Sequence, residues 1–361
     1  MRWQFPTVSN ASSMSVRQIA QLAGVSFSTV SLALNDSPRI SAETKAKILQ
    51  LARKLDYKPN PKINELMSHL RARPKTKTEA CLGVMALYDS PRPWERRPSI
   101  RTWNGMQARA KALGYRLETF WPQAPGMTMR RLRTVLDARG IQGLLCFGSS
   151  NFEEKFPEEL DHYAIVTIGL SIQSSLHRII SHFYADTTRS LNRIYELGYR
   201  RPGLVVRRDE EIRCNHTYTS AYLGWCDYTL GAAGTVPVLR LEGADLTPMG
   251  DWLDRCRPDV LVLVHLHDQL REIDTLLRNR SLKVPDGIGV AVVSTVLEGT
   301  KYSGVAPHRF LMGTRAVDLL VNRITNRDFG FPTNPRIEMV EGHWVDGFSL
   351  RKNASVKAGT H

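Results

Sequence analysis

Residues 16–34 read VRQIAQLAGVSFSTVSLAL, and this stretch decides the fold of the N-terminal part of the chain. Apolar residues recur at three- and four-residue spacing on both sides of the Gly-Val-Ser segment, which predicts two short helices joined by a tight turn. Gly24 suits the positive φ common just past a helix. Ser26 is a good N-cap whose hydroxyl can accept from the amide of Ser28 or Thr29. A short helix that starts with small polar residues suits the DNA major groove, although an ordinary helical hairpin has the same pattern.

A third helix is predicted to begin after Ser41 and to end near residues 56–59. Residues 15–60 then form a three-helix domain of about the smallest size that folds alone. Residues 1–14 are expected to be a disordered extension, with Met14 an alternative start to Met1.

Residues 61–80 are predicted to form a hinge helix and a basic linker. Ile63, Leu66 and Leu70 lie on one apolar stripe, and basic side chains surround it. Such a helix either packs on a neighbour or lies in the minor groove of DNA with an apolar wedge between bases.

Positive charge is concentrated in this N-terminal part. Residues 1–80 hold 13 Lys and Arg against 5 Asp and Glu, a net charge of +8, whereas the whole 361-residue chain carries +14. Because the charge coincides with the helix pair, it indicates a protein that binds a polyanion.

The rest of the sequence points away from several other classes of protein. Five scattered cysteines show no metal-ligand spacing, which favours reduced thiols, no metal and a cytoplasmic location. No apolar run approaches the roughly 20 residues that span a bilayer, so no membrane partner is expected. The chain contains no Gly-rich phosphate loop, Gly-x-Ser-x-Gly or His-Glu-x-x-His motif, so neither a cofactor nor an enzyme is predicted.

Residues 81–350 alternate between apolar strand-like runs and helical patterns, and residues 351–361 are predicted to be a tail. This alternation predicts parallel sheets covered by helices on both faces. The length is comfortable for two lobes, and a cleft between them is the natural ligand site.

The chain resembles the lactose/galactose repressor (LacI/GalR) family of bacterial regulators. The specific part is Val16-x-x-Ile-Ala-x-x-Ala-Gly-Val-Ser-x-x-Thr-Val-Ser-x-x-Leu-Asn35, followed by Ser41-x-x-Thr-x-x-x-Ile48 and Asp56-Tyr57-x-Pro59-Asn60. The resemblance implies a helix-turn-helix DNA-binding domain, a hinge helix, and a two-lobed α/β sensor similar to type I periplasmic binding proteins. It also implies a homodimer on near-palindromic double-stranded operator DNA.

The resemblance assigns DNA contacts to single positions. Phe27 and Ser28 stand where the family reads base edges, and Leu32 stands where many members carry an Arg for guanine. Leucine can instead touch a thymine methyl group. Leu66 is the expected minor-groove wedge, with Leu70 as its competitor. The remaining implied contacts, most of them on phosphates, are Ser26, Thr29, Ser31, Asn35, Arg39 and Asn60.

The sensor cleft departs from the family, because most of the carboxylates and the Arg that usually hold sugar hydroxyls are replaced. Aromatic residues near strand ends suit sugar faces, whereas an Arg-rich rim at Arg92, Arg96, Arg97 and Arg101 suits an anion. The candidate ligand-binding residues are Tyr88, Asp89, Trp94, Phe147, His182, Phe183, His216, Tyr218, His267 and Asp268.

The sequence therefore predicts a DNA-binding transcriptional regulator, with repression expected and activation left open. Its operator affinity is expected to respond to a small-molecule effector between the lobes, by resemblance a sugar. The alternative is a DNA-binding regulator or architectural protein with a degenerate, ligand-free sensor.

Overall fold

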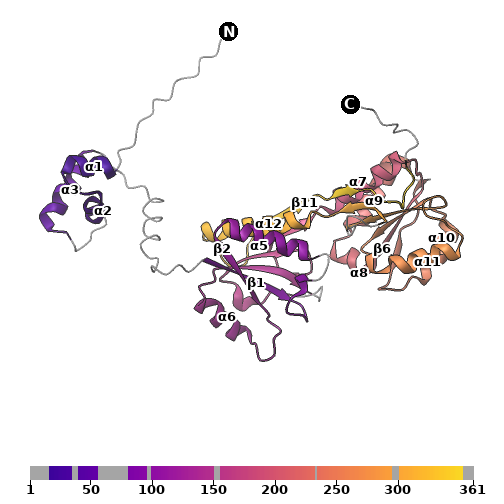
Figure 1. The fold of residues 1–361 in the computed structure, drawn as a ribbon, viewed down its shortest axis with the longest axis horizontal. Helices are drawn as coiled ribbons and strands as arrows, with labels where there is room; N and C mark the ends of the chain where they lie inside the picture. The colour runs from indigo at the N-terminus through magenta and orange to yellow at the C-terminus, as the bar shows by residue number, and fades with distance from the viewer. Residues whose placement is uncertain are drawn as a thin grey trace, which may run out of the picture. The chain divides into compact units, whose positions relative to one another are not determined.

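A computed structural model of the chain describes residues 16–34, 40–55, 80–95, 99–149, 155–231, 234–294 and 301–352. The chain divides into two compact units, Met1–Thr78 and Glu79–His361, which we call the N-terminal unit and the C-terminal unit (Figure 1). In the described parts of both units, no helix is long and apolar enough to span a membrane.

The N-terminal unit contains three helices, α1 (Val16–Ala23), α2 (Phe27–Leu34) and α3 (Ala42–Lys54). Gly24 adopts a φ of +67°, and the Ser26 hydroxyl accepts from the Thr29 amide at 3.1 Å, so the predicted turn and cap are confirmed. Ser41 caps α3 in the same way. The small core consists of Ile19, Ala20, Ala23, Val30, Ala33, Ile48 and Ala52.

The first lobe of the C-terminal unit is a six-stranded sheet of order β11-β5-β4-β3-β1-β2. All neighbouring strands are parallel. The strands are β1 (Ala80–Leu87), β2 (Tyr115–Phe120), β3 (Gly143–Ser149), β4 (Ala164–Ile168), β5 (His177–Ser181) and β11 (Ile337–Val340). Helices α5 (Ile100–Ala112) and α12 (Arg309–Thr325) share one apolar core with the sheet, and α6 (Met129–Ala138) shares another. Figure 1 shows α5 and α12 side by side along this lobe.

The second lobe is a six-stranded sheet of order β12-β10-β9-β8-β6-β7, in which only β12 runs antiparallel to its neighbour β10. Its strands are β6 (Pro202–Arg207), β7 (Leu239–Leu241), β8 (Val260–Val264), β9 (Gly289–Val293), β10 (Ser303–Ala306) and β12 (His343–Val345). Its helices are α7 (Phe183–Glu196), α8 (Arg208–Arg213), α9 (Thr217–Leu230), α10 (Thr247–Cys256) and α11 (Leu270–Asn279). Short 3-10 turns occur at Pro93–Glu95, Glu158–Leu160 and His267–Gln269. The predicted two-lobed α/β architecture is confirmed.

In the described chain, three segments pass from one lobe to the other: β5 to α7, β10 to α12, and β11 to β12. We call these segments the crossovers. The buried Asp186 carboxylate near the start of α7 accepts from the Gly342 amide at 2.7 Å and so ties the first crossover to the third. The His308 and His343 rings stack with centroids 4.4 Å apart and tie the second crossover to the third.

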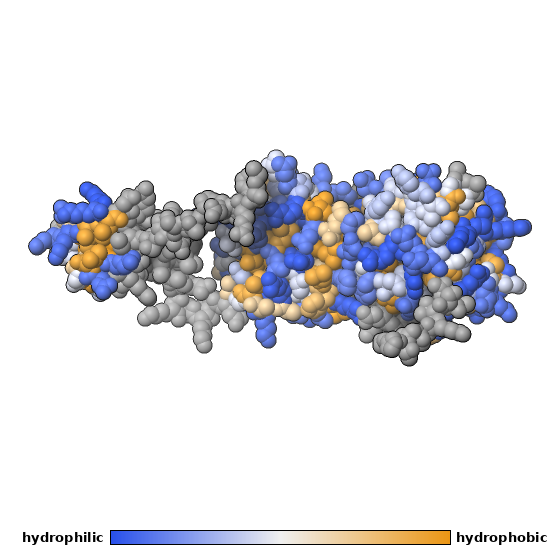
Figure 2. All heavy atoms as spheres, turned by 90° about the horizontal axis from the view of Figure 1, so that it is seen from above, coloured by the Kyte–Doolittle hydropathy of each residue, from blue (hydrophilic) through white to orange (hydrophobic). Residues whose placement is uncertain are grey.

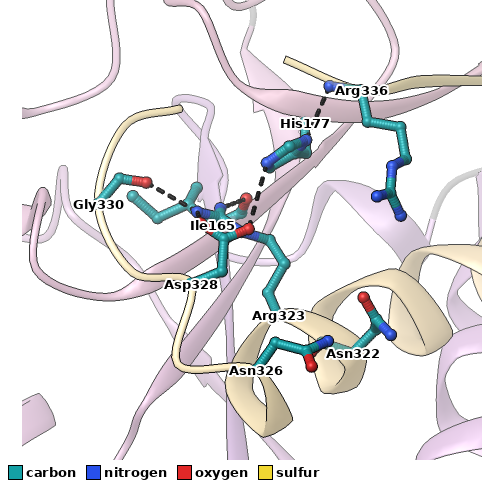
Figure 3. A network of polar contacts seen from close by, with 8 residues as sticks. All are labelled: Ile165, His177, Asn322, Arg323, Asn326, Asp328, Gly330 and Arg336. Carbon is teal, nitrogen blue, oxygen red and sulfur yellow. Dashed lines mark hydrogen bonds and ion pairs between the residues drawn. The ribbon is translucent and has the colours of Figure 1, made fainter. Parts of the chain in front are cut away.

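A buried arginine joins several elements of the first lobe (Figure 3). Arg323 on α12 is only 2% exposed and donates to the carbonyl oxygens of Ile165 at 2.6 Å and Gly330 at 2.9 Å. Its guanidinium also pairs with Asp328, and these hydrogen bonds lower the pKa of that carboxyl. His177 lies 3.6 Å from the same carboxylate. The network holds the end of α12 against β4 and β5.

Candidate functional site

The first candidate site is α2 of the N-terminal unit. Ser26 is exposed at the N-terminus of α2, and its hydroxyl also lies 2.8 Å from the Thr29 hydroxyl. Phe27, Ser28, Ser31 and Leu32 lie within α2, but their side chains are outside the described part of the structure. Asn35, Arg39, Asn60, Leu66 and Leu70 also lie outside the described residues. The structure therefore supports α2 as a helix preceded by a tight turn, and the individual DNA contacts of its side chains stay predictions.

The second candidate site is a cavity of about 170 Å³ to which both lobes contribute. Typical pockets for drug-sized ligands measure about 300–1,000 Å³, so this cavity suits a compact ligand. From the first lobe it is lined by Tyr88, Ser99, Thr102, Phe147, Ile168, Gly169, Leu170, Ser171, Ser181, Arg309 and Met312. From the second lobe it is lined by Phe183, Arg213, Cys214, His265 and Ser294.

The cavity lies where strands of both sheets end. His265 directly follows β8 and Ser294 directly follows β9, and their φ angles are +54° and +73°. Ligands of parallel α/β sheets bind at the carboxyl ends of strands, and positive φ at non-glycine residues is uncommon and often occurs at functional sites. Both features support this cavity as a binding site.

A buried phenol organises the second-lobe wall of the cavity. The Tyr218 hydroxyl lies 2.8 Å from His265 Nε2 and 2.9 Å from Ser294 Oγ, and the Phe183 ring packs 5.3 Å from the Tyr218 ring. Complete burial raises the pKa of Tyr218 well above its usual value, so the phenol stays neutral. Tyr218 thus fixes His265 and Ser294 from behind and does not itself line the cavity.

The charged groups on the cavity wall are cationic. Arg309 begins α12 and donates to the Ser294 carbonyl at 3.3 Å, and burial lowers the pKa of its guanidinium. Arg213 at the end of α8 forms an ion pair with Glu210. Among the described residues, no Asp or Glu lines the cavity.

The structure brings some of the predicted ligand residues together and separates others. Tyr88, Phe147 and Phe183 line the cavity. His182 instead accepts the Ala185 amide at 3.3 Å as the N-cap of α7, and Trp94 is buried and stacks on Trp103 with centroids 4.9 Å apart. Three other predicted ligand residues are exposed and do not line the cavity: Asp89, His216 and Asp268.

The His267 side chain is outside the described part of the chain, as are Arg96 and Arg97 of the predicted basic rim. Arg92 pairs with Glu95 at 3.1 Å, and neither Arg92 nor Arg101 lines the cavity. Sequence reasoning missed Arg213, His265, Ser294 and Arg309; His265 and Ser294 were detectable in principle, because each is the first residue after a strongly apolar strand.

One group of residues near the cavity has the donor atoms of a metal site. Ligand atoms of Glu210, Cys214 and His265 lie within 4.8 Å of one another. However, Glu210 is already paired with Arg213, and desolvation raises the pKa of Cys214 to about 11. A protonated thiol beside a guanidinium is a poor ligand set for a cation, so these three residues do not suit a metal ion.

Comparison with known proteins assigns the N-terminal unit. The family model "Bacterial regulatory proteins, lacI family" matches residues 15–60. Residues 15–60 are therefore assigned as a helix-turn-helix domain of the lacI type. The protein named "Probable HTH-type transcriptional repressor ExuR" of Bacillus subtilis (strain 168) is 51% identical over 53 residues, 15% of this chain and 16% of that protein. The HTH-type transcriptional regulator AglR of Rhizobium meliloti (strain 1021) is 45% identical over 47 residues, 13% of each chain. The chain thus aligns with about a sixth or less of the length of these curated relatives.

Solved structures resemble the chain over most of its length. A transcriptional regulator CelR–cellobiose complex has a TM-score of 0.56 at 21% identity, covering 93% of this chain and 99% of that one. The lac repressor dimer bound to operator and the anti-inducer ONPF has a TM-score of 0.54 at 14% identity, covering 94% and 99%. At these identities the likeness establishes the fold alone.

Proposed function

We propose that this protein is a sequence-specific DNA-binding transcriptional regulator, with repression the expected mode, whose operator affinity changes when a small molecule binds between the two lobes. The observation that carries the proposal is the combination of a lacI-family helix-turn-helix domain with a two-lobed sensor that encloses a polar cavity. Nothing in this function requires an enzyme active site or a cofactor.

The DNA-reading element of the proposal is α2. Phe27, Ser28 and Leu32 are proposed to contact base edges, with Leu32 on a thymine methyl group. Contacts to phosphates and flanking positions are proposed for Ser26, Thr29, Ser31, Asn35, Arg39 and Asn60, and the minor-groove wedge is proposed to be Leu66. The net charge of +8 on residues 1–80 supports these contacts, because phosphate neutralisation supplies most of the non-specific affinity.

A homodimer is the proposed assembly, because near-palindromic operators match a two-fold axis. Large apolar side chains are exposed on the first lobe, with Phe310 50% exposed on α12 and Met339 52% exposed on β11. Figure 2 shows apolar patches among hydrophilic residues on the face of the molecule that it presents. The lac repressor, a structural neighbour of this chain, was solved as a dimer on operator DNA.

The cytoplasm is the proposed location, where operator DNA is found. All five cysteines are free in the structure, which agrees with a reducing compartment. The proposed domain boundaries are an extension over 1–14, the DNA-binding domain over 15–60, the hinge and linker over 61–80, the sensor over 81–350 and a tail over 351–361.

The proposal is tested by selecting sites for the full-length protein from random-sequence DNA and titrating salt against the selected site. We expect a near-palindromic consensus and a steep fall of affinity with salt, because each neutralised phosphate adds about 0.9 to the slope of log K against log salt. Binding that is indifferent to both sequence and salt would refute the proposal. Specific binding that no small molecule alters would favour the alternative of a ligand-free sensor.

A further inference from the structure

The chemistry of the cavity wall restricts the kind of molecule that can fill it. The wall presents two guanidinium groups and an imidazole together with hydroxyl groups, and no described carboxylate faces the cavity. Hydroxyl groups can donate or accept, whereas guanidinium groups only donate. The wall therefore offers an excess of charged donors to its occupant.

Arg309 is the decisive residue in this wall. Within the described part of the chain it forms no ion pair with a carboxylate, and its hydrogen bond is the 3.3 Å contact with the Ser294 carbonyl. Arg309 is partly buried in the cavity wall, and this desolvation lowers the pKa of its guanidinium. Desolvating a cation without a charged partner is costly, and an anionic ligand at this position would offset that cost.

Arg213 adds a second guanidinium from the opposite lobe. Tyr88 of the first lobe and Arg213 of the second both line the cavity, and the charge of Arg213 opposes the rise that burial causes in the pKa of Tyr88. Arg213 already pairs with Glu210. Because a guanidinium carries five N–H donors in a fork, it can keep this pair and still donate to a ligand.

We infer that the effector is a compact anion that also carries hydroxyl groups, such as a monosaccharide-sized acid or phosphate ester, with its anionic group held by Arg309 and Arg213. This inference rests on the proposed function and specifies the ligand class of that same site. The volume of about 170 Å³ limits the ligand to about one sugar ring. The Phe147 and Phe183 rings offer apolar faces for that ring, and Ser99, Thr102 and Ser171 offer partners for its hydroxyls.

The test compares ligands that differ only in charge. Full-length protein is titrated by calorimetry and melted in the presence of D-glucuronate, D-glucose 6-phosphate and D-glucose, and of the three corresponding galactose compounds, with inorganic phosphate as a bare anion. We expect at least one charged sugar to bind about tenfold or more tightly than its neutral counterpart, because hydrogen bonds to charged groups are about twice as strong as neutral ones. The carboxylate and phosphate arms decide which anionic group the site prefers. A neutral sugar that binds as tightly as its charged counterparts, or a complete lack of response to every charged sugar, would overturn the inference.

Variants then assign the effect to the cavity. Arg309→Met removes the charge, keeps an apolar stem of similar length, and is expected to weaken the charged ligand about tenfold or more. Arg315→Met is the matched control, because Arg315 is exposed on the same helix and pairs with Glu338 at 3.4 Å. Arg309→Lys keeps the positive charge but loses the forked set of N–H donors, so we expect it to lose part of the affinity for the charged ligand. This variant takes the place of Arg309→Met if the Met variant fails to fold. Unchanged affinity in both Arg309 variants would also overturn the inference.

The failure of this inference is distinguishable from the failure of the proposed function. If operator binding responds to a neutral compound and to no charged one, the proposed regulatory function is supported and the anionic ligand class is refuted. If the protein binds a charged sugar without any specific DNA binding, the ligand class stands and the regulator falls.

Discussion

We expect Asp186, which ties the first crossover to the third, to make the stability of the protein depend on pH. Its side chain is fully buried in α7, where its Oδ1 accepts from the Gly342 amide and its Oδ2 has no hydrogen-bond partner among the described residues. Burial raises the pKa of Asp186 from 3.8 to about 6, although the Gly342 amide works against the rise. The folded protein therefore binds this proton more tightly than the unfolded chain does.

The sign and size of the effect follow from that difference. A carboxyl whose pKa is raised by folding contributes its full stability below about pH 4 and loses it as pH rises through about 6. The loss amounts to about 3 kcal/mol, since each pKa step of one is worth about 1.4 kcal/mol. Asp186→Asn keeps an acceptor for the Gly342 amide and never ionises, so at pH 7 we expect it to be about 1–3 kcal/mol more stable than the wild type.

The assay is urea unfolding of the full-length wild type and variant between pH 4 and pH 7.5, followed by tryptophan fluorescence. Other groups titrate in this range, so the measured quantity is the difference in unfolding free energy between the two proteins at each pH. That difference should grow from pH 4 to pH 6 and then level off. Asp251→Asn, on an exposed position of α10, serves as the control and should show no such growth. A difference that stays constant with pH, or a variant less stable at pH 7, would refute the assignment of a desolvated, proton-binding Asp186.

Three other substitutions test the structure. Ser26→Ala removes the cap of α2 and should cost about 1 kcal/mol, which corresponds to a loss of hydrogen-exchange protection in α2 of about fivefold. Ser26→Asn keeps a capping oxygen and should retain that protection. An equal loss in both variants would contradict the capping role. Gly313→Ala places a Cβ 2.1 Å from a backbone oxygen of α5 and should lower the free energy of unfolding by about 3 kcal/mol or more. In the control Gly224→Ala the new Cβ has no neighbour closer than 3.9 Å, so this variant should gain about 0.5–1 kcal/mol from helix propensity. Comparable melting temperatures for the two variants would show that the α5–α12 contact yields easily. Asp328→Asn removes the anionic partner of Arg323 and should lower the free energy of unfolding by about 1–3 kcal/mol at pH 7. This loss should shrink in acid, where the wild-type carboxylate becomes protonated. A loss that stays the same in acid would show that packing, and not the ion pair, is responsible.

The sequence was sufficient for features that depend on neighbours along the chain. Gly24, Ser26 and Ser41 gave correct turns and caps because each acts through its own backbone or through an amide three residues away. The apolar strands likewise predicted two parallel sheets, since strands buried on both faces are continuously hydrophobic. In α3 the buried face consists of Ile48 and Ala52, with Leu51 and Leu55 partly buried against the same core, whereas Ala46 is exposed despite being apolar.

The sensor site was predicted only in part, because its membership depends on contacts distant in sequence. His182 was expected to bind ligand, but it directly precedes α7, and its ring is used to cap that helix. Trp94 was expected to line the site, but stacking on Trp103 buries it in the first-lobe core. Conversely, Arg309 is separated from Arg213 by almost a hundred residues, and only the pairing of the two sheets' strand ends brings both to one cavity.

The position of Arg309 also shows how a ligand could act on the rest of the molecule. Arg309 directly follows His308, whose ring stacks on His343, so the cavity wall and two of the crossovers are adjacent in the chain. Its hydrogen bond to the Ser294 carbonyl joins α12 of the first lobe to the end of β9 in the second lobe. Because a guanidinium carries five N–H donors, an anion bound to Arg309 would share the guanidinium with the Ser294 carbonyl and would add a charged contact beside this link between the lobes. A ligand shifts an equilibrium only through unequal affinity for its states, so an effector that binds more tightly when this link is formed would favour that arrangement of the lobes.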